Sequence, residues 1–195
     1  AFSVIYMSAA AADYHEVEAR VGRAAARRGV EGDTRFLAYL GDSVSGARYV
    51  AAKRSANGIN RAMADFLQCY DLYLTPTTAG PAPQLGENVL PASLTLLSRA
   101  ARALGLGGWM LRTGLARGGF ESAAAPVPYT QLANISGLPS ISLPGYVDPD
   151  SGLPVGAMLT APQGGEGLLL RLAGQVEEAR PWLHQYPFNN NNSEA

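Results

Sequence analysis

Three short apolar runs interrupt a chain that otherwise follows helical spacing, and they constrain the fold more than any other feature. They are 70–75, which Pro76 ends, 140–143 and 156–160. All three read as apolar throughout, without alternation, which is typical of strands buried on both faces, and a turn-forming stretch at 148–152 joins the last two. Three such strands cannot supply one another with covered faces and paired edges. We therefore predict an α/β fold, a mixed sheet flanked by helices, that forms an incomplete half of a full domain.

The spacing of apolar residues predicts the flanking helices. The clearest stripe runs from Tyr49 to Phe66 at intervals of three and four. Asp13 and Glu16 have capping-box spacing, which predicts a surface helix that ends at Gly29. The uncharged opening run 1–12 is too short to span a bilayer, and we expect it to be a buried segment whose upstream neighbour is absent. The expected helices are 13–28, 34–40, one from Ser45 to Phe66, 93–104, 109–115 and one that opens at Glu166, whereas 117–128 is expected to be irregular.

Charge and cysteine content exclude several functional classes. The chain carries 15 Lys and Arg residues against 16 Asp and Glu residues, a net charge of -1, so we expect no nucleic-acid partner. Cys69 is the only cysteine, which excludes an intramolecular disulfide and a cysteine-based zinc site and favours a cytoplasmic protein. We expect no membrane partner, no metal and no cofactor. Residues 1–188 read as a portion of one domain, and 189–195 as a disordered tail.

The residues alone do not assemble a catalytic site. The chain has no Gly-x-Ser-x-Gly elbow, and Ser45 has the position of a helix cap. Its histidines, His15 and His184, have no second ligand at metal-binding spacing. Lys53 is the only lysine, and it lies on the charged side of the long helical stripe, where a general base would not be dehydrated. Cys69 precedes a strand and is expected to behave as a small apolar residue. We therefore predict no catalytic residue in this chain.

Three segments, in this order and at these distances, resemble the C-terminal half of the amidase signature family. The resemblance covers essentially the whole chain, least specifically before Phe66, and is closer to bacterial amidases and aminohexanoate-oligomer hydrolases than to the tRNA amidotransferase subunit. The first two segments are 66–77 (FLQCYDLYLTPT) and 129–144 (YTQLANISGLPSISLP). The third is 152–182, which contains the short sequences GLPVG, GE, LLRLA and PW in this order.

The resemblance implies an amide hydrolase whose chemistry lies elsewhere. In the family a Ser-Ser-Lys triad and a run of oxyanion-binding backbone amides come from the N-terminal half, and this sequence has no Gly/Ser-rich segment of that kind. The full protein is then expected to cleave non-peptide C–N bonds of small linear or cyclic amides, with this chain supplying sheet and pocket wall. The implied partners are the amide substrate, the N-terminal half and, as one option, a second copy in a homodimer. The chain by itself is expected to be inactive.

The same resemblance implies two substrate-binding residues. The short helix that begins near Tyr129 lies beside the substrate channel in the family, so Thr130 and Ala133 are the candidate lining residues, although both could equally serve only to pack the helix on the sheet. Met158 stands where many relatives have glutamine, which removes a polar contact there.

Two other functions stay open at this point. A non-catalytic binding or interaction module derived from an amidase would be a folded monomer that binds acyl amides or a protein without turnover. An amidotransferase A-type subunit would require a partner subunit and nucleic-acid contacts that the charge of -1 does not favour.

Overall fold

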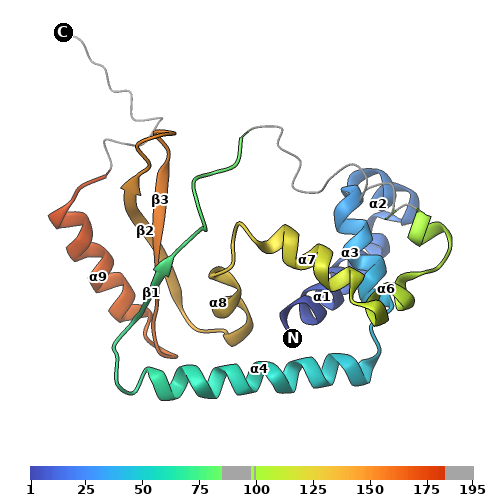
Figure 1. The fold of residues 1–195 in the computed structure, drawn as a ribbon, viewed down its shortest axis with the longest axis horizontal. Helices are drawn as coiled ribbons and strands as arrows, with labels where there is room; N and C mark the ends of the chain where they lie inside the picture. The colour runs from blue at the N-terminus through green and yellow to red at the C-terminus, as the bar shows by residue number, and fades with distance from the viewer. Residues whose placement is uncertain (85–97, 99, 183–195) are drawn as a thin grey trace, which may run out of the picture. The chain divides into compact units, whose positions relative to one another are not determined.

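The computed structural model describes residues 1–84, 98 and 100–182. The chain divides into two compact units. The first unit comprises Ala1–Arg61 and Pro83–Pro126, and the second comprises Ala62–Ala82 and Val127–Ala195. The elements, drawn in Figure 1, are α1 (Phe2–Val21), α2 (Arg23–Gly29), α3 (Gly32–Asp42), α4 (Gly46–Phe66), β1 (Tyr73–Pro76), α6 (Gly107–Thr113), α7 (Leu115–Ala124), α8 (Thr130–Ser136), β2 (Ser140–Val147), β3 (Pro154–Thr160) and α9 (Glu166–Ala179).

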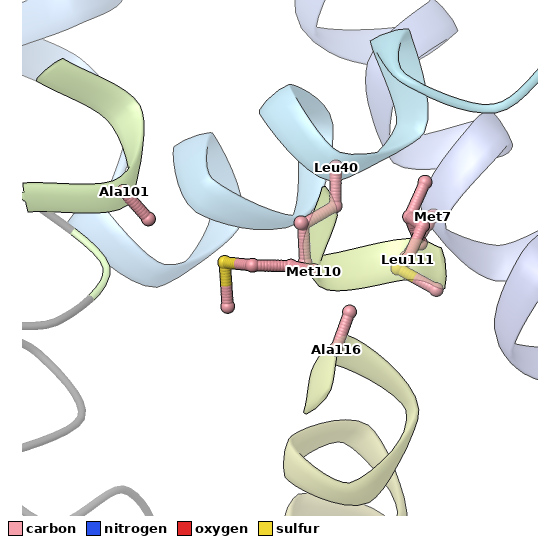
Figure 2. Close-up of a cluster of buried hydrophobic side chains, with 6 residues drawn as sticks. All are labelled: Met7, Leu40, Ala101, Met110, Leu111 and Ala116. Atoms are coloured by element: carbon pink, nitrogen blue, oxygen red, sulfur yellow. The ribbon is translucent and has the colours of Figure 1, made fainter. Parts of the chain in front are cut away.

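The first unit is helical and packs around α3. Its core is the cluster shown in Figure 2, which draws buried side chains from α1, α3, α6, α7 and the helical residues 100–103 together. Gly41 of α3 lies directly against α1, because a Cβ at this position would meet the carbonyl oxygen of Met7 at 2.0 Å. The clustered residues are Met7, Leu40, Ala101, Met110, Leu111 and Ala116.

The helix predicted at 13–28 starts too late and misses a break at Gly22, although a helix does end at Gly29 as expected. The helix begins at Phe2 rather than Asp13 and ends at Val21, because Gly22 adopts φ 82° and starts a separate helix that runs to Gly29. The alanine-rich residues 9–12 have the highest helix propensity, which overrides the cap signal at Asp13. The opening run is only partly the buried segment we expected, since Met7 and Ala11 are its buried residues.

The expectation that 117–128 is irregular is also wrong. Helix α7 occupies most of it, from Leu115 to Ala124, after a left-handed break at Gly114. The pair Gly118-Gly119 weakens the helix signal in the sequence, and packing of Ala116 in the core outweighs that low propensity. The helix expected at 93–104 falls largely outside the described residues.

The second unit contains a three-stranded antiparallel sheet in the order β1-β3-β2. The hairpin of β2 and β3 turns at 148–152 as predicted, with Ser140 opposite Thr160 and Ser142 opposite Met158. Helix α9 packs against β2 and begins at Glu166 as predicted (Figure 1). The α/β class with helices flanking a sheet is therefore confirmed.

Two details of the predicted sheet are wrong. Strand β1 is not buried on both faces, since its Leu74 side chain is 64% exposed. The strands are also not apolar throughout: Thr75, Ser140 and Ser142 alternate with apolar residues. A period-2 alternation is typical of an antiparallel sheet with two unlike faces, which is the sheet observed.

Candidate functional site

One face of the sheet carries a set of hydroxyl side chains, which we call the hydroxyl face. Side chains at paired positions of an antiparallel sheet point to the same side, and they alternate along each strand. The register pairs Thr75 with Met158 and Met158 with Ser142, and the next row on the same face pairs Tyr73 with Thr160 and Thr160 with Ser140. The hydroxyl face comprises Tyr73, Thr75, Thr77, Ser140, Ser142 and Thr160.

The hydroxyls of this face bond to one another. Ser140 Oγ and Thr160 Oγ1 are 2.8 Å apart, and Thr77 Oγ1 and Ser142 Oγ are 2.5 Å apart. Thr160 is buried and Ser142 is exposed, so the face extends from the core of the unit to its surface. The buried Thr75 Oγ1 has no hydrogen-bond partner among the described residues.

Gly156 of β3 creates the space in which Thr77 and Ser142 meet. A Cβ on this glycine would lie 2.6 Å from Ser142 Oγ and 2.6 Å from Thr77 Oγ1, closer than real contacts allow. The backbone N–H of Thr77 also donates to the carbonyl of Gly156 over 2.8 Å. Two side chains, Ser142 of β2 and Thr77 directly after β1, thus lie close together over Gly156.

The hydroxyl face can bind polar groups, but the described residues do not activate it for catalysis. A serine or threonine hydroxyl is a weak nucleophile unless a base removes its proton. The hydrogen bonds found for the pairs Ser140–Thr160 and Thr77–Ser142 join hydroxyl to hydroxyl and reach no lysine or histidine. Lys53 is exposed on α4, as its sequence position indicated. Within the described ranges, no group of three histidine, cysteine or acidic side chains is arranged to hold a metal ion.

Helix α8 holds both sequence-predicted binding residues. Thr130 and Ala133 are three residues apart, hence on one side of the helix, and both are half-buried. Thr130 Oγ1 donates to the carbonyl of Val127 over 3.3 Å, so this hydroxyl is already engaged. The helix ends at Gly137 with φ 70°, and β2 begins at Ser140. The assignment of Thr130 and Ala133 as substrate-binding residues stays a prediction.

The other polar candidates of the sequence lie apart from one another. His15 Nε2 is 2.8 Å from Asp42 Oδ1 in the first unit, and this bond raises the pKa of His15. Ser45 caps α4 as expected, because its Oγ accepts the N–H of Arg48. Cys69 is exposed, although we expected it to behave as a small apolar residue. His184 falls outside the described residues.

The hydroxyl face itself was missed by our sequence analysis. Its signal is present in the alternations Tyr73-x-Thr75-x-Thr77 and Ser140-x-Ser142. The apolar residues between these positions instead favour the prediction of strands that are buried on both faces. The contact between Thr77 and Ser142 had no sequence signal, since the residues are 65 positions apart on strands that do not pair.

Comparison with known proteins identifies relatives of this chain. No family model matches it. A Mycobacterium bovis protein named "Putative amidase AmiC" is 37% identical over 124 residues, which are 64% of this chain and 21% of that protein. The 6-aminohexanoate-cyclic-dimer hydrolase of a Pseudomonas strain is 35% identical over 118 residues, 60% of this chain and 20% of the relative.

A solved structure extends the match to almost the whole chain. The structure of a 6-aminohexanoate cyclic dimer hydrolase superposes on 93% of this chain and 35% of its own, with a TM-score of 0.68 and 26% sequence identity. The chain thus spans about a fifth of the length of the sequence relatives and about a third of the solved hydrolase. The resemblance drawn from the three sequence segments is confirmed. This chain is therefore amidase-like, related to amidases and cyclic-dimer hydrolases over most of its own length and over part of theirs.

Proposed function

We propose that this chain is the C-terminal part of an amidase-type hydrolase that cleaves non-peptide C–N bonds in small linear or cyclic amides. In this proposal the chain supplies sheet and pocket wall, and a Ser-Ser-Lys triad comes from an N-terminal half of the same protein. The observation that carries the proposal is the superposition of 93% of the chain on a 6-aminohexanoate cyclic dimer hydrolase at a TM-score of 0.68.

The local chemistry supports a binding role over a catalytic one. The hydroxyl face offers hydrogen-bond donors and acceptors, which suit an amide, and its two hydroxyl pairs lack a base that would make a nucleophile. Thr130 and Ala133 of α8 complete the proposed pocket wall. The acting protein is a cytoplasmic enzyme without cofactor or nucleic-acid partner in this proposal. Within the described residues, no helix has the length and apolar character needed to cross a membrane.

A chimera tests the function directly. In the Pseudomonas 6-aminohexanoate-cyclic-dimer hydrolase, the segment that matches this chain is replaced by residues 1–195, and hydrolysis of the cyclic dimer is measured. We expect turnover by the chimera, none by residues 1–195 alone, and none by the hydrolase from which the segment is deleted. A folded chimera without turnover, or hydrolysis by residues 1–195 alone at an enzyme's rate, would overturn the proposal.

Residues 1–195 alone distinguish the proposed function, part of an enzyme, from a binding module. A module derived from an amidase would give a monomer of residues 1–195 that binds the cyclic dimer in calorimetry without turnover. The proposed function instead predicts no binding by residues 1–195 alone, because the pocket needs walls from both halves of the protein.

A further inference from the structure

Thr77, which directly follows β1, forms a hydrogen bond with Ser142 of β2, although β1 and β2 are not neighbouring strands. Strand β3 separates β1 from β2, and neighbouring strands lie about 4.8 Å apart, so the outer strands are about 10 Å apart. Two short side chains still come within 2.5 Å of each other above the middle strand. We call Thr77, Ser142 and Gly156 the clasp.

The clasp depends on the missing side chain of Gly156. Any Cβ there would stand 2.6 Å from both hydroxyl oxygens, so an alanine would force Thr77 and Ser142 apart. Gly156 has no positive φ, which means that its backbone conformation does not require glycine. Space for the hydroxyl pair is therefore what glycine provides at this position.

The clasp fixes the start of the loop that follows β1. Thr77 is the first residue after Pro76, and it is held twice, through its N–H on the carbonyl of Gly156 and through its hydroxyl on Ser142. Within the loop itself, Thr78 Oγ1 donates a hydrogen bond to the carbonyl of Gly80 over 2.7 Å. Ser142 is exposed, so this hydrogen bond does not serve to satisfy a buried polar group.

We propose that the clasp is a positioning device that holds residues 77–80 in place as a wall of the substrate pocket. This inference rests on the proposed function and adds to it that the loop after β1 borders the pocket. Loops that a rigid scaffold holds in place carry a disproportionate share of binding residues in proteins. Thr77 and Ser142 act here through the loop and take no part in bond breaking.

The first test uses the chimera with the cyclic dimer as substrate. Because one hydrogen bond contributes about 1 kcal/mol, Ser142→Ala and Thr77→Val are each expected to raise KM about fivefold with kcat nearly unchanged. Ser142→Thr, which keeps a hydroxyl, is expected to restore most of the affinity. Gly156→Ala is expected to raise KM as the clasp variants do.

The control is Ser151→Ala in the turn between β2 and β3. Ser151 Oγ also makes a 2.5 Å hydrogen bond, to Asp148 Oδ2, but it lies outside the clasp and the loop. We expect the chimera with Ser151→Ala to have the same KM as the unsubstituted chimera. Equal KM values for Ser142→Ala and Ser151→Ala would overturn the inference, as would failure of Ser142→Thr to restore affinity.

The second test does not depend on activity. Hydrogen exchange of the amides at 77–80 is measured in residues 1–195, and Ser142→Ala is expected to speed it about fivefold, whereas Ser151→Ala leaves it unchanged. Unchanged exchange in Ser142→Ala would refute the clasp. An inactive chimera with faster exchange in Ser142→Ala would instead refute the proposed function and leave the positioning of the loop established.

Discussion

Individual glycines decide which backbones touch in this protein. Gly41 of α3 and Gly118 of α7 are both helical and belong to the same unit, yet their surroundings differ. A Cβ at Gly41 would meet the carbonyl oxygen of Met7 at 2.0 Å and the Cβ of Ala11 at 2.8 Å, whereas a Cβ at Gly118 would meet nothing within 4 Å. The same substitution should therefore have opposite effects at the two positions.

We expect Gly41→Ala to lower the free energy of unfolding by about 3 kcal/mol, because helix α1 must move away from α3. Gly118→Ala should raise it by up to about 1 kcal/mol, because alanine favours the helix and meets open space. Urea unfolding followed by circular dichroism checks both variants. Equal stabilities for the two variants would show that the α1–α3 contact is not as tight as described.

A second prediction at this scale concerns His15. Its hydrogen bond to Asp42, with a smaller effect of Glu18, raises its pKa above the ordinary value of 6.5. Because the pKa of His15 is higher in the folded state than in the unfolded state, its protonation stabilises the folded state. This stabilisation is complete at a pH below the pKa of the unfolded state, and it is lost as the pH rises through the pKa of the folded state. The His15 side chain is 55% exposed, so solvent limits the contribution to under about 1 kcal/mol.

Asp42→Asn is therefore expected to return the pKa of His15 toward 6.5 and to flatten the loss of stability on raising the pH. An NMR titration of the His15 ring protons measures the shift. Glu121→Gln serves as the control, since Glu121 pairs with Arg117 and not with His15. A His15 pKa that stays the same in Asp42→Asn would contradict the assigned cause.

At the scale of elements, amphipathic spacing predicted α4, but the two ends of its stripe, Tyr49 and Phe66, are exposed. Burial differs sharply between neighbours in helix α9: Leu169 is 3% exposed, and the next residue, Leu170, is 66% exposed. The residues at helical spacing from Leu169 share its side, and Leu168, Leu172 and Val176 are half-buried. One position along a helix turns the side chain by about 100°, so neighbouring leucines have unlike energetic roles.

Leu169→Ala is expected to lower the free energy of unfolding by about 2–4 kcal/mol, because it leaves a cavity under α9. Leu170→Ala should change it by less than about 0.5 kcal/mol. Chemical denaturation of both variants under one set of conditions gives the comparison. A loss for Leu170→Ala as large as that for Leu169→Ala would mean that α9 packs through a different side.

At the scale of the whole molecule, the free edge of β1 is the notable surface. Thr77 donates its N–H to Gly156, and in an antiparallel pair the backbone groups of every second residue face the partner. The N–H and C=O of Leu74 therefore point away from β3, and no other described strand pairs with β1. The exposed Leu74 side chain makes this edge prone to pair with another chain.

We expect residues 1–195 alone to self-associate in size-exclusion chromatography with light scattering, and Leu74→Lys to reduce this association, because a charge opposes edge pairing. Leu170→Lys is the matched control: that leucine is 66% exposed against 64% for Leu74, but it lies on a helix. If Leu170→Lys reduces association as much as Leu74→Lys does, exposed apolar area rather than the strand edge is responsible.

The amino-acid sequence by itself determined the local features of this protein. Spacing and turn chemistry among near neighbours determine helix α4, the turn at 148–152 and the start of α9 at Glu166. The resemblance carried by the three sequence segments also agrees with the amidase relatives. Tertiary structure decided the rest. The contact of Gly41 with Met7 and the bond of Thr77 to Ser142 join residues far apart in the chain. Such contacts depend on how elements cross and on strand register, which short-range spacing does not encode.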